Sequence, residues 1–549
     1  MVYSIPSHAR ERTLTSSPTA AERTAFGLLA AGALVVVLAA TPYKAFELDR
    51  HLLPKELVVH VVATLAATLC LLRVRRFPLV TVDLLLLVYL GLSLVSTLFA
   101  TNLWLGFRSL GLSLSGAALF WSARRVARAG LGPPLVATVA AASVIGAVTA
   151  LLQAYGFESD LMSLTRAPGG TYGNRNFMAH AAVIGLPALL LTALTARSRI
   201  RFALSTAGLA SVAGALTLSR SRAAWLAVGA CLAMLLVDRL SSPLRFGPRH
   251  RRRLQLLGLG VLLGVGLALV IPNTLDWRSD SPYLDSLKGM VNYQEGSGKG
   301  RLEQYASTIR LALRHPILGV GPGNWSVAYP AVAGPDDPSL DQEGMTANPW
   351  PSSDWMAFLS ERGIPAFFCL SLLLVGGGVI GWVYWRAESR GADGDQVDLT
   401  PLALAATVVA AMVTGAFDAV LLCPTPTYFV WTLLGALAPA EPRRSPRWEL
   451  HLVPRWVLVT VITTGLALVM RSTLQVAAMA RYGTGWSTSR TEEAARLDPG
   501  SYRIAIRLAE RASRRRRCDM VRRYAGRAAN LYPEAGEPKD LLGRCGRKD

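Results

Sequence analysis

Two arginines lie in a turn where a membrane protein would ordinarily have small polar residues. The segment LTLSRSRAAWLA, residues 216–227, joins an apolar run ending at Leu218 to one beginning at Ala223, and it contains Arg220 and Arg222. Ionisable groups at a membrane edge are costly and point to function. The planar fork of arginine bonds phosphate oxygens in pairs and stays charged at any working pH. The alternative interpretation is that both side chains snorkel to lipid phosphates.

Other connections between apolar runs carry arginines as well. One reads YGFESDLMSLTRAPGGTYGNRNF, and the longest, residues 273–354, includes GKGRLEQYASTIRLALRHPILGVGPGNW. Within it, residues 301–314 have the apolar spacing of a helix that Pro316 ends. Arginines in such connections could bind a diphosphate and stabilise the charge that builds on it as a leaving group, without a metal. The candidates for diphosphate binding are Arg175, Arg220, Arg222, Arg301 and Arg314.

The glycine-rich segment GVGPGN, residues 319–324, could bring backbone N–H groups close to an anion. It lacks the Lys-Ser/Thr pair of a nucleotide-binding P-loop. The sequence contains no H-E-x-x-H, no C-x-x-C pair and no nucleotide fingerprint after a strand. It therefore predicts neither a metal site nor a cofactor.

The composition indicates what holds these residues in place. Of 549 residues, 52% are hydrophobic and 17% charged, whereas a soluble protein carries about 25% charged residues. Apolar runs of roughly 17–22 residues, each long enough to span a bilayer, recur along the chain. We predict an all-α polytopic membrane protein with about thirteen transmembrane helices (twelve to fourteen). The predicted spans are 25–43, 56–73, 79–100, 104–122, 133–155, 177–195, 202–218, 223–238, 254–272, 364–385, 401–420, 425–440 and 455–471.

The distribution of basic residues supports this count. Lysine and arginine concentrate on cytoplasmic connections, and with a cytoplasmic N-terminus every connection after an even-numbered span is basic. The connections after the third and eleventh spans, TNLW and LLCPTP, contain neither residue. On this map the turn with Arg220 and Arg222 faces outward, against the rule that orients the rest. The basic connections contain Arg73, Arg75 and Arg76; Arg124, Arg125 and Arg128; Arg197, Arg199 and Arg201; Arg239 to Arg253; Arg386 and Arg390; and Arg443, Arg444 and Arg447.

The chain divides into three predicted parts. A cytoplasmic segment, 1–24, precedes a transmembrane domain, 25–471, whose largest periplasmic loop is 273–354, and a tail, 472–549, follows. In the tail, AARLDPGSYRIAIRLAERA has helical spacing and LYPEA echoes LDPGS about 35 residues later, which resembles a tetratricopeptide helical hairpin. Thirteen spans place this small α-helical tail in the periplasm.

The cysteines provide a check on that placement. Cys518 and Cys545 both lie in the tail and could form a disulfide in the oxidising periplasm. If they were reduced, twelve or fourteen spans and a cytoplasmic tail would be favoured. The other four are predicted to be packing residues in or beside apolar spans: Cys70, Cys231, Cys369 and Cys423.

Five motifs in order carry a resemblance to a known family. They are GTYGNRNFMA, SRSRAAW, GRLEQY, HPILGVGPGNW and SSDWMAFLSERGIPAF. Over roughly residues 165–385 the chain resembles the O-antigen ligase and O-antigen polymerase superfamily, including its single large outer loop. The resemblance implies a GT-C-like glycosyltransferase of the bacterial inner membrane, active on its periplasmic face. The family's outward arginines are thought to grip the diphosphate, and the matching residues are Arg222 and Arg301, with Arg220 as a neighbour.

The resemblance also implies the substrates. The donor would be a glycan on undecaprenyl diphosphate, and the acceptor would be lipid A–core, a second lipid-linked glycan or, in some relatives, a protein. Membrane lipids and, through the tail, polysaccharide-assembly proteins are further expected partners. The net charge of +21 comes mostly from predicted cytoplasmic loops and the tail, so it reports topology and no nucleic-acid binding is expected.

The sequence departs from the family at the catalytic base. Family ligases open the helix after the large loop with a His motif, and Ser352 stands in that place here. Asp354 remains, and Glu361 matches the acidic residue ahead of the family's glycine, Gly363. Asp354 could deprotonate an acceptor hydroxyl or could merely cap the helix. His315 is a third catalytic candidate, in a position that is often structural; the missing histidine favours a polymerase over a strict ligase.

Two other classes of function remain open. A transporter or flippase of lipid-linked oligosaccharide would explain the many spans, but transporters often show internal repeats and broken helices, and the sequence reveals neither. A membrane scaffold that recruits partners through its tail would leave the outward arginines without a purpose.

Overall fold

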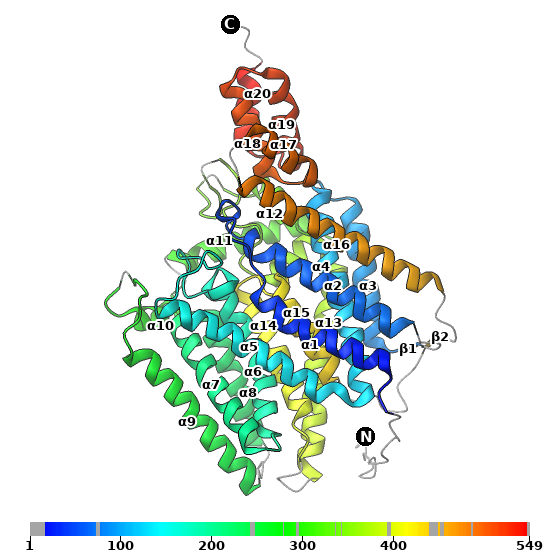
Figure 1. Ribbon diagram of the computed structural model, residues 1–549, viewed down its shortest axis with the longest axis vertical. Helices are drawn as coiled ribbons and strands as arrows, with labels where there is room; N and C mark the ends of the chain where they lie inside the picture. Colours follow the sequence, from blue (N-terminus) through cyan, green and yellow to red (C-terminus); the bar gives the residue numbers. More distant parts are fainter. Residues whose placement is uncertain are drawn as a thin grey trace.

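Helices make up almost all of the regular structure in the described part of the chain (Figure 1). The computed structural model describes residues 17–72, 77–241, 247–277, 279–292, 296–334, 336–341, 343–391, 397–438, 448–450, 455–484 and 487–545. Most of the predicted N-terminal segment, 1–24, and the arginines at 73–76 and 443–447 lie outside these residues. Two short strands, β1 (Phe77–Leu79) and β2 (Trp448–Leu450), pair antiparallel.

Each predicted span coincides with a helix, within several residues at its ends. The helices are α1 (Ala20–Leu38), α2 (Asp49–Leu71), α3 (Thr81–Leu98), α4 (Leu103–Val126), α5 (Gly132–Ala154), α6 (Arg175–Leu194), α7 (Arg199–Ser219), α8 (Arg222–Ser241), α9 (Pro248–Val270), α13 (Asp354–Gly391), α14 (Thr400–Phe417), α15 (Pro424–Leu437) and α16 (Arg455–Gly483). The loop between α9 and α13 contains α10 (Pro282–Val291), α11 (Gly296–Arg314) and α12 (Trp325–Ala328). Short helical turns are η1 (Lys44–Phe46), η2 (Ala127–Leu131), η3 (Gly170–Tyr172) and η4 (Tyr329–Ala331).

The prediction of a polytopic all-α membrane protein is confirmed. Among the described residues, 11 helical stretches are long and apolar enough to cross a membrane. One of them, Leu103–Ala154, contains both α4 and α5, joined through η2. The remaining predicted span is α15, which has only 14 residues, all buried. Because protein surrounds α15, its length does not have to match the hydrocarbon thickness.

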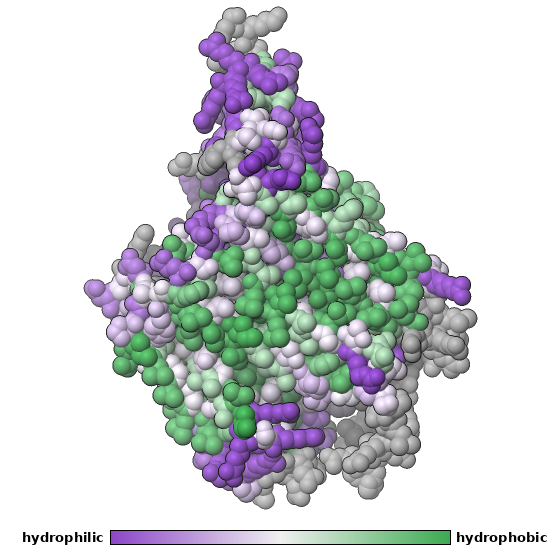
Figure 2. Space-filling view, in the orientation of Figure 1, coloured by the Kyte–Doolittle hydropathy of each residue, from purple (hydrophilic) through white to green (hydrophobic). Residues whose placement is uncertain are grey.

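The large loop and the tail lie on the same side of the helix bundle. Figure 2 shows an apolar belt across the middle of the molecule, with hydrophilic residues on the tail and at the opposite end. The tail contacts this side of the bundle, where Asn102 Nδ2 donates to the carbonyl of Leu531 at 3.2 Å. It also contacts the loop, since the Gly536 N–H donates to the carbonyl of Glu343 at 3.1 Å.

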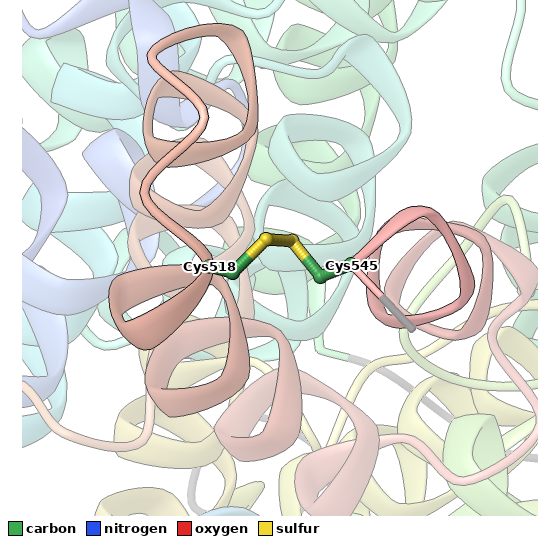
Figure 3. The surroundings of a disulfide bond; sticks show 2 residues. All are labelled: Cys518 and Cys545. Atoms are coloured by element: carbon green, nitrogen blue, oxygen red, sulfur yellow. A yellow bond between two sulfur atoms is a disulfide. The ribbon is translucent and has the colours of Figure 1, made fainter. Parts of the chain in front are cut away.

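The tail continues directly from the last long helix. It consists of the end of α16 and four helices, α17 (Thr488–Leu497), α18 (Tyr502–Arg514), α19 (Cys518–Leu531) and α20 (Gly536–Arg544). Apolar faces of these helices pack together around Ile504, Leu508 and Val521. A disulfide joins Cys518 to Cys545, as their placement in the tail had suggested (Figure 3). The likeness of this tail to tetratricopeptide repeats stays a prediction.

The first turns of α13 are set off from the rest of the helix by a break. Gly363 has φ 78° and ψ 170°, outside the helical region, and a Cβ atom there would lie 2.2 Å from the carbonyl oxygen of Ile317. Pro365 follows and has no N–H to donate, while the N–H of Ile364 donates to the carbonyl of Pro316 at 2.8 Å. The break lies immediately before the predicted span 364–385, and a count of apolar residues does not register that the helix extends across it to Asp354.

We expect Gly363→Ala to destabilise the protein. A side chain at positive φ costs about 1–3 kcal/mol, and the added methyl would collide with the backbone at Ile317. The matched control is Gly376→Ala in the same helix, where the added Cβ would meet no atom of the described residues within 4 Å. Thermal unfolding of the detergent-solubilised protein should separate the two variants, and equal melting temperatures would contradict this account of the break.

Candidate functional site

The turn between α7 and α8 holds Arg220 in an unusual backbone conformation. Arg220 has φ 53° and ψ 28°, in the left-handed region, which few non-glycine residues adopt. The buried Ser219 stabilises the turn, because its Oγ accepts from the N–H of Ser221 at 3.2 Å. Arg220 Nε in turn donates to Ser286 Oγ of α10 at 2.9 Å. The turn therefore directs this guanidinium toward the large loop.

Two of the five predicted arginines lie over Trp277, and a third lies nearby. The guanidinium carbons of Arg220 and Arg175 lie 4.5 Å and 5.2 Å from the centre of the Trp277 ring. Arg222 Nη1 donates to the carbonyl of Gly289 near the end of α10, and Arg222 is close enough to Arg175 to interact with it electrostatically. We call Arg175, Arg220, Arg222 and Trp277 the arginine cluster.

The arginine cluster carries positive charge that the protein compensates only in part. Neither Arg175 nor Arg220 forms an ion pair with any of the described residues. Partial burial lowers the pKa of the Arg220 guanidinium from its ordinary value, and nearby Tyr283 and Asp285 oppose that shift. An arginine remains charged even so. The arrangement thus suits an anion with several oxygens, such as a diphosphate.

The remaining predicted cations lie on α11, and the structure separates them. Arg301, in the second turn of this helix, is within electrostatic reach of the buried His180. Arg314 and His315 are exposed at the other end, about 20 Å further along at ~1.5 Å per residue. The backbone of His315 closes the helix end, because its carbonyl accepts from the N–H of Gly319 at 2.9 Å. The structure therefore separates Arg314 and His315 from Arg301.

Asp354 is fully buried and both of its carboxylate oxygens are occupied. The N–H groups of Val420 and Leu421 donate to Oδ1 and Oδ2 at 2.9 Å and 2.7 Å. Asp354 thereby fastens the segment after α14 to the start of α13. Ser352, where the family has its histidine, is also held through its backbone, since its N–H donates to Gln304 Oε1 at 2.6 Å and its carbonyl accepts from the Tyr305 hydroxyl at 2.8 Å.

Glu361 differs from Asp354 because one of its oxygens is free. Oε1 accepts from the N–H of Trp325 at 3.3 Å, whereas Oε2 is buried with no hydrogen-bond partner among the described residues. Trp325 follows the GVGPGN segment directly, and the N–H of Gly321 in that segment donates to the carbonyl of Glu361 at 2.8 Å. The glycine-rich segment thus contacts the backbone of Glu361 through Gly321, while the N–H groups of Gly323 and Trp325 face the Glu361 carboxylate.

A small cavity of about 80 Å³ borders Glu361. Its lining includes Trp350 and the ion pair in which Arg108 Nη2 lies 2.7 Å from Glu56 Oε1. We call it the acid cavity. The Trp350 ring lies 6.0 Å from the ring of Phe177, two residues after Arg175 of the arginine cluster. The acid cavity therefore borders the first turn of α6, the helix that Arg175 begins.

Several buried polar residues were not singled out from the sequence. His180 is completely buried, and neither ring nitrogen has a hydrogen-bond partner among the described residues. One helical turn earlier, Asn176 Nδ2 donates to Asp418 Oδ2 at 3.4 Å. Glu56 and Arg108 lie within predicted spans, so the rule that intramembrane charges mark functional sites would have found both.

The fold and these residues define a multi-pass α-helical membrane protein with cationic and acidic groups gathered on the side of its tail. Residues 206–371 match the family described as O-antigen ligase. The matched segment contains Arg220, Arg222, Arg301 and the break at Gly363, and it confirms the resemblance over this part of the chain. The chain therefore contains an O-antigen ligase domain over residues 206–371, and this domain implies an enzyme of the O-antigen ligase type. No curated protein matches the chain.

We expect Glu361→Gln and Asp354→Asn to affect different properties. In Glu361→Gln the new amide oxygen can still accept from Trp325, so the fold should persist while loss of a general base lowers activity by about 10²-fold or more. In Asp354→Asn the new side chain can accept only one of the two N–H groups, and an unpaired buried N–H costs about 1–3 kcal/mol of stability. Thermal unfolding and a gel of cell-surface polysaccharide, with membrane levels matched, measure the two effects. The reverse pattern would assign the base to Asp354.

Proposed function

We propose that the protein transfers or polymerises a glycan carried on undecaprenyl diphosphate during the assembly of a surface polysaccharide. The observation that carries this proposal is the arginine cluster, in which Arg175 and Arg220 flank Trp277 without an ion pair among the described residues. Bidentate bonds from guanidinium groups match the oxygens of a diphosphate. The O-antigen ligase domain supports the same chemistry, because ligation of a membrane-borne glycan needs a site for its carrier.

We place the reaction on the periplasmic face of the bacterial inner membrane. The basic connections along the sequence favour a cytoplasmic location for the end opposite the tail. The disulfide between Cys518 and Cys545 supports an oxidising compartment for the tail. Because the tail and the large loop lie on the same side, the arginines of the outward turns would face the periplasm as well.

In the proposed reaction the arginine cluster binds the diphosphate of the donor. An acceptor hydroxyl attacks the anomeric carbon, and the bond from that carbon to the diphosphate oxygen breaks, leaving its electron pair on the diphosphate. The guanidinium groups stabilise the negative charge that develops on this leaving group, so the proposal requires no metal. The free Oε2 of Glu361 accepts the proton of the hydroxyl.

The break in α13 favours one other candidate function, transport of the lipid-linked glycan. Transporters and flippases often contain discontinuous membrane helices, and α13 is discontinuous at Gly363. A flippase would move the lipid-linked glycan across the membrane without forming a new glycosidic bond. The two proposals differ in the fate of the donor, since only a transferase releases free undecaprenyl diphosphate.

The first test is complementation of a gene deletion with Arg220→Ala/Arg222→Ala, confirmed present and folded in the membrane. We expect long polysaccharide chains to disappear from a gel, because the diphosphate loses two charged partners. Arg314→Ala is the matched control, since Arg314 is exposed and lies at the far end of α11 from Arg301. It should leave the polysaccharide unchanged.

The product that remains in weakened variants such as Arg222→Lys would identify the branch of the superfamily. Polymer that stays on the lipid carrier would indicate a ligase, and single repeats at the surface would indicate a polymerase. Unchanged polysaccharide in the double variant would mean that both arginines only anchor the turn in lipid. Loss of polysaccharide without accumulation of donor on the periplasmic face would instead support a flippase.

A further inference from the structure

A second cavity, of about 210 Å³, lies between the membrane domain and the tail. We call it the tail cavity. Its walls come from the start of α4, from α16 and from the tail, and they include Trp104, Arg471, Gln475, Tyr502 and Tyr532. Apart from Met345, its lining residues lie outside the matched segment 206–371.

Polar atoms in the walls of the tail cavity lack partners. Gln475 is only 8% exposed, and its Oε1 has no hydrogen-bond partner among the described residues. The same holds for Arg471 Nε and the Tyr502 hydroxyl. Buried polar atoms are almost always hydrogen-bonded, because leaving them unpaired is costly. A polar cavity of this size is therefore filled, either by water or by a polar ligand.

The walls of the tail cavity contain both hydrogen-bond donors and hydrogen-bond acceptors. Arg108 Nη2 lies 2.9 Å from Asp49 Oδ1, and Asp498 lies near enough to Arg471 to interact with it. Burial raises the pKa of the Asp498 carboxyl, and Arg471 opposes that shift. Carboxylates next to guanidinium groups can bond the hydroxyl groups of a sugar, each of which both donates and accepts.

The shape and size of the tail cavity further restrict the class of ligand that it can bind. Aromatic rings line it, with those of Tyr502 and Tyr532 5.2 Å apart and Trp104 in the wall. Pockets for drug-sized ligands have volumes of about 300–1,000 Å³, so a cavity of about 210 Å³ suits one small ring-shaped unit. Charged and hydroxyl groups alternate in its walls with apolar side chains such as Phe46 and Met479, a mixture that suits a sugar ring better than a lipid chain.

We propose that the tail cavity binds one sugar residue of the acceptor glycan. This inference rests on the proposed function and assigns a place to the second substrate. The tail cavity and the acid cavity share Leu105 and Arg108 in their walls. Arg108 contacts Asp49 of the tail cavity and Glu56 of the acid cavity. An acceptor anchored beside the tail can thus extend past Arg108 toward Glu361.

The order of the sites assigns the sugar to the acceptor and not to the donor. The arginine cluster, where the diphosphate of the donor would bind, includes Arg175 at the start of α6, and Phe177 of the same helix turn contacts Trp350 in the wall of the acid cavity. The tail cavity borders the same acid cavity through Leu105 and Arg108. The acid cavity with Glu361 thus adjoins both the start of α6 and the tail cavity, which is the arrangement that a site between donor and acceptor needs.

The test uses the full-length protein in lipid nanodiscs. The probes are the mono- and oligosaccharides released by mild acid from the host's own surface polysaccharide, and binding is followed by saturation-transfer NMR and titration calorimetry. The double variant Gln475→Leu/Tyr502→Phe removes two unpaired polar atoms while keeping the apolar parts of both side chains. Because each hydrogen bond contributes severalfold to affinity, binding should weaken about tenfold or more. Tyr524→Phe, in the core of the tail, is the matched control and should bind as wild type.

The kinetics of glycan transfer distinguish a sugar of the acceptor from a sugar of the donor in the tail cavity. If the tail cavity holds the acceptor, the KM for the acceptor rises in the double variant while the KM for the donor stays constant. A rise only in the KM for the donor would overturn the assignment to the acceptor. Wild-type protein that binds none of the probes, or a double variant that binds them equally well, would overturn the site itself.

Two further controls keep the outcome clear. Gln475→Met, close in length to glutamine but without its amide, should reproduce part of the loss, and an unchanged melting temperature should exclude unfolding. If the arginine cluster variants kept normal polysaccharide, the proposed function would fail. If they lost it while the tail cavity variants bound and transferred normally, only the tail cavity proposal would fail.

Discussion

The broken backbone of α13 is the constraint on which the site depends. Because the hydrocarbon interior supplies no water, backbone groups released by a break in a membrane helix must be paired within the protein. The segment after α11 provides those partners: the N–H of Val320 donates to the carbonyl of Ser360, and the carbonyl of Pro316 accepts from Ile364. The large loop is thereby fixed to the helix bundle. The same contacts place Gly323 in the wall of the acid cavity beside Glu361.

The position of the tail follows from the uninterrupted course of α16. α16 runs without interruption from Arg455 to Gly483, so it carries the tail helices directly on a membrane helix. Contacts at Asn102 and Glu343 then hold the far part of the tail against the bundle and the loop. A surface domain attached through a flexible linker could not form the wall of a cavity with the membrane domain. The tail therefore belongs to the same structural unit as the acid cavity.

The sequence predicted those site residues that depart from a strong pattern of hydropathy or charge. The spans follow from apolar runs, and Arg220 and Arg222 were conspicuous because they place two charges in a short outward turn, against the charge rule. Arg314 was grouped with Arg301 because both lie on one predicted helix, but the length of α11 separates them. Hydropathy also could not show that Gly363 interrupts α13, since a glycine scarcely changes the apolar count. Both features depend on distances and contacts in three dimensions, which a pattern along the sequence does not specify.

Only contacts in the structure distinguish the two acidic candidates for the general base. Asp354 and Glu361 stand seven residues apart at the start of one helix, and the sequence offers each the same chemistry. The two N–H groups that Asp354 accepts occupy both of its oxygens, so protonating it would break the junction between α13 and the segment after α14. Glu361 can take a proton on Oε2 without losing its bond to Trp325. A chain with Ser352 in place of a histidine therefore still holds a buried carboxylate that fits the proposed role of proton acceptor, and the break in α13 places it beside a cavity.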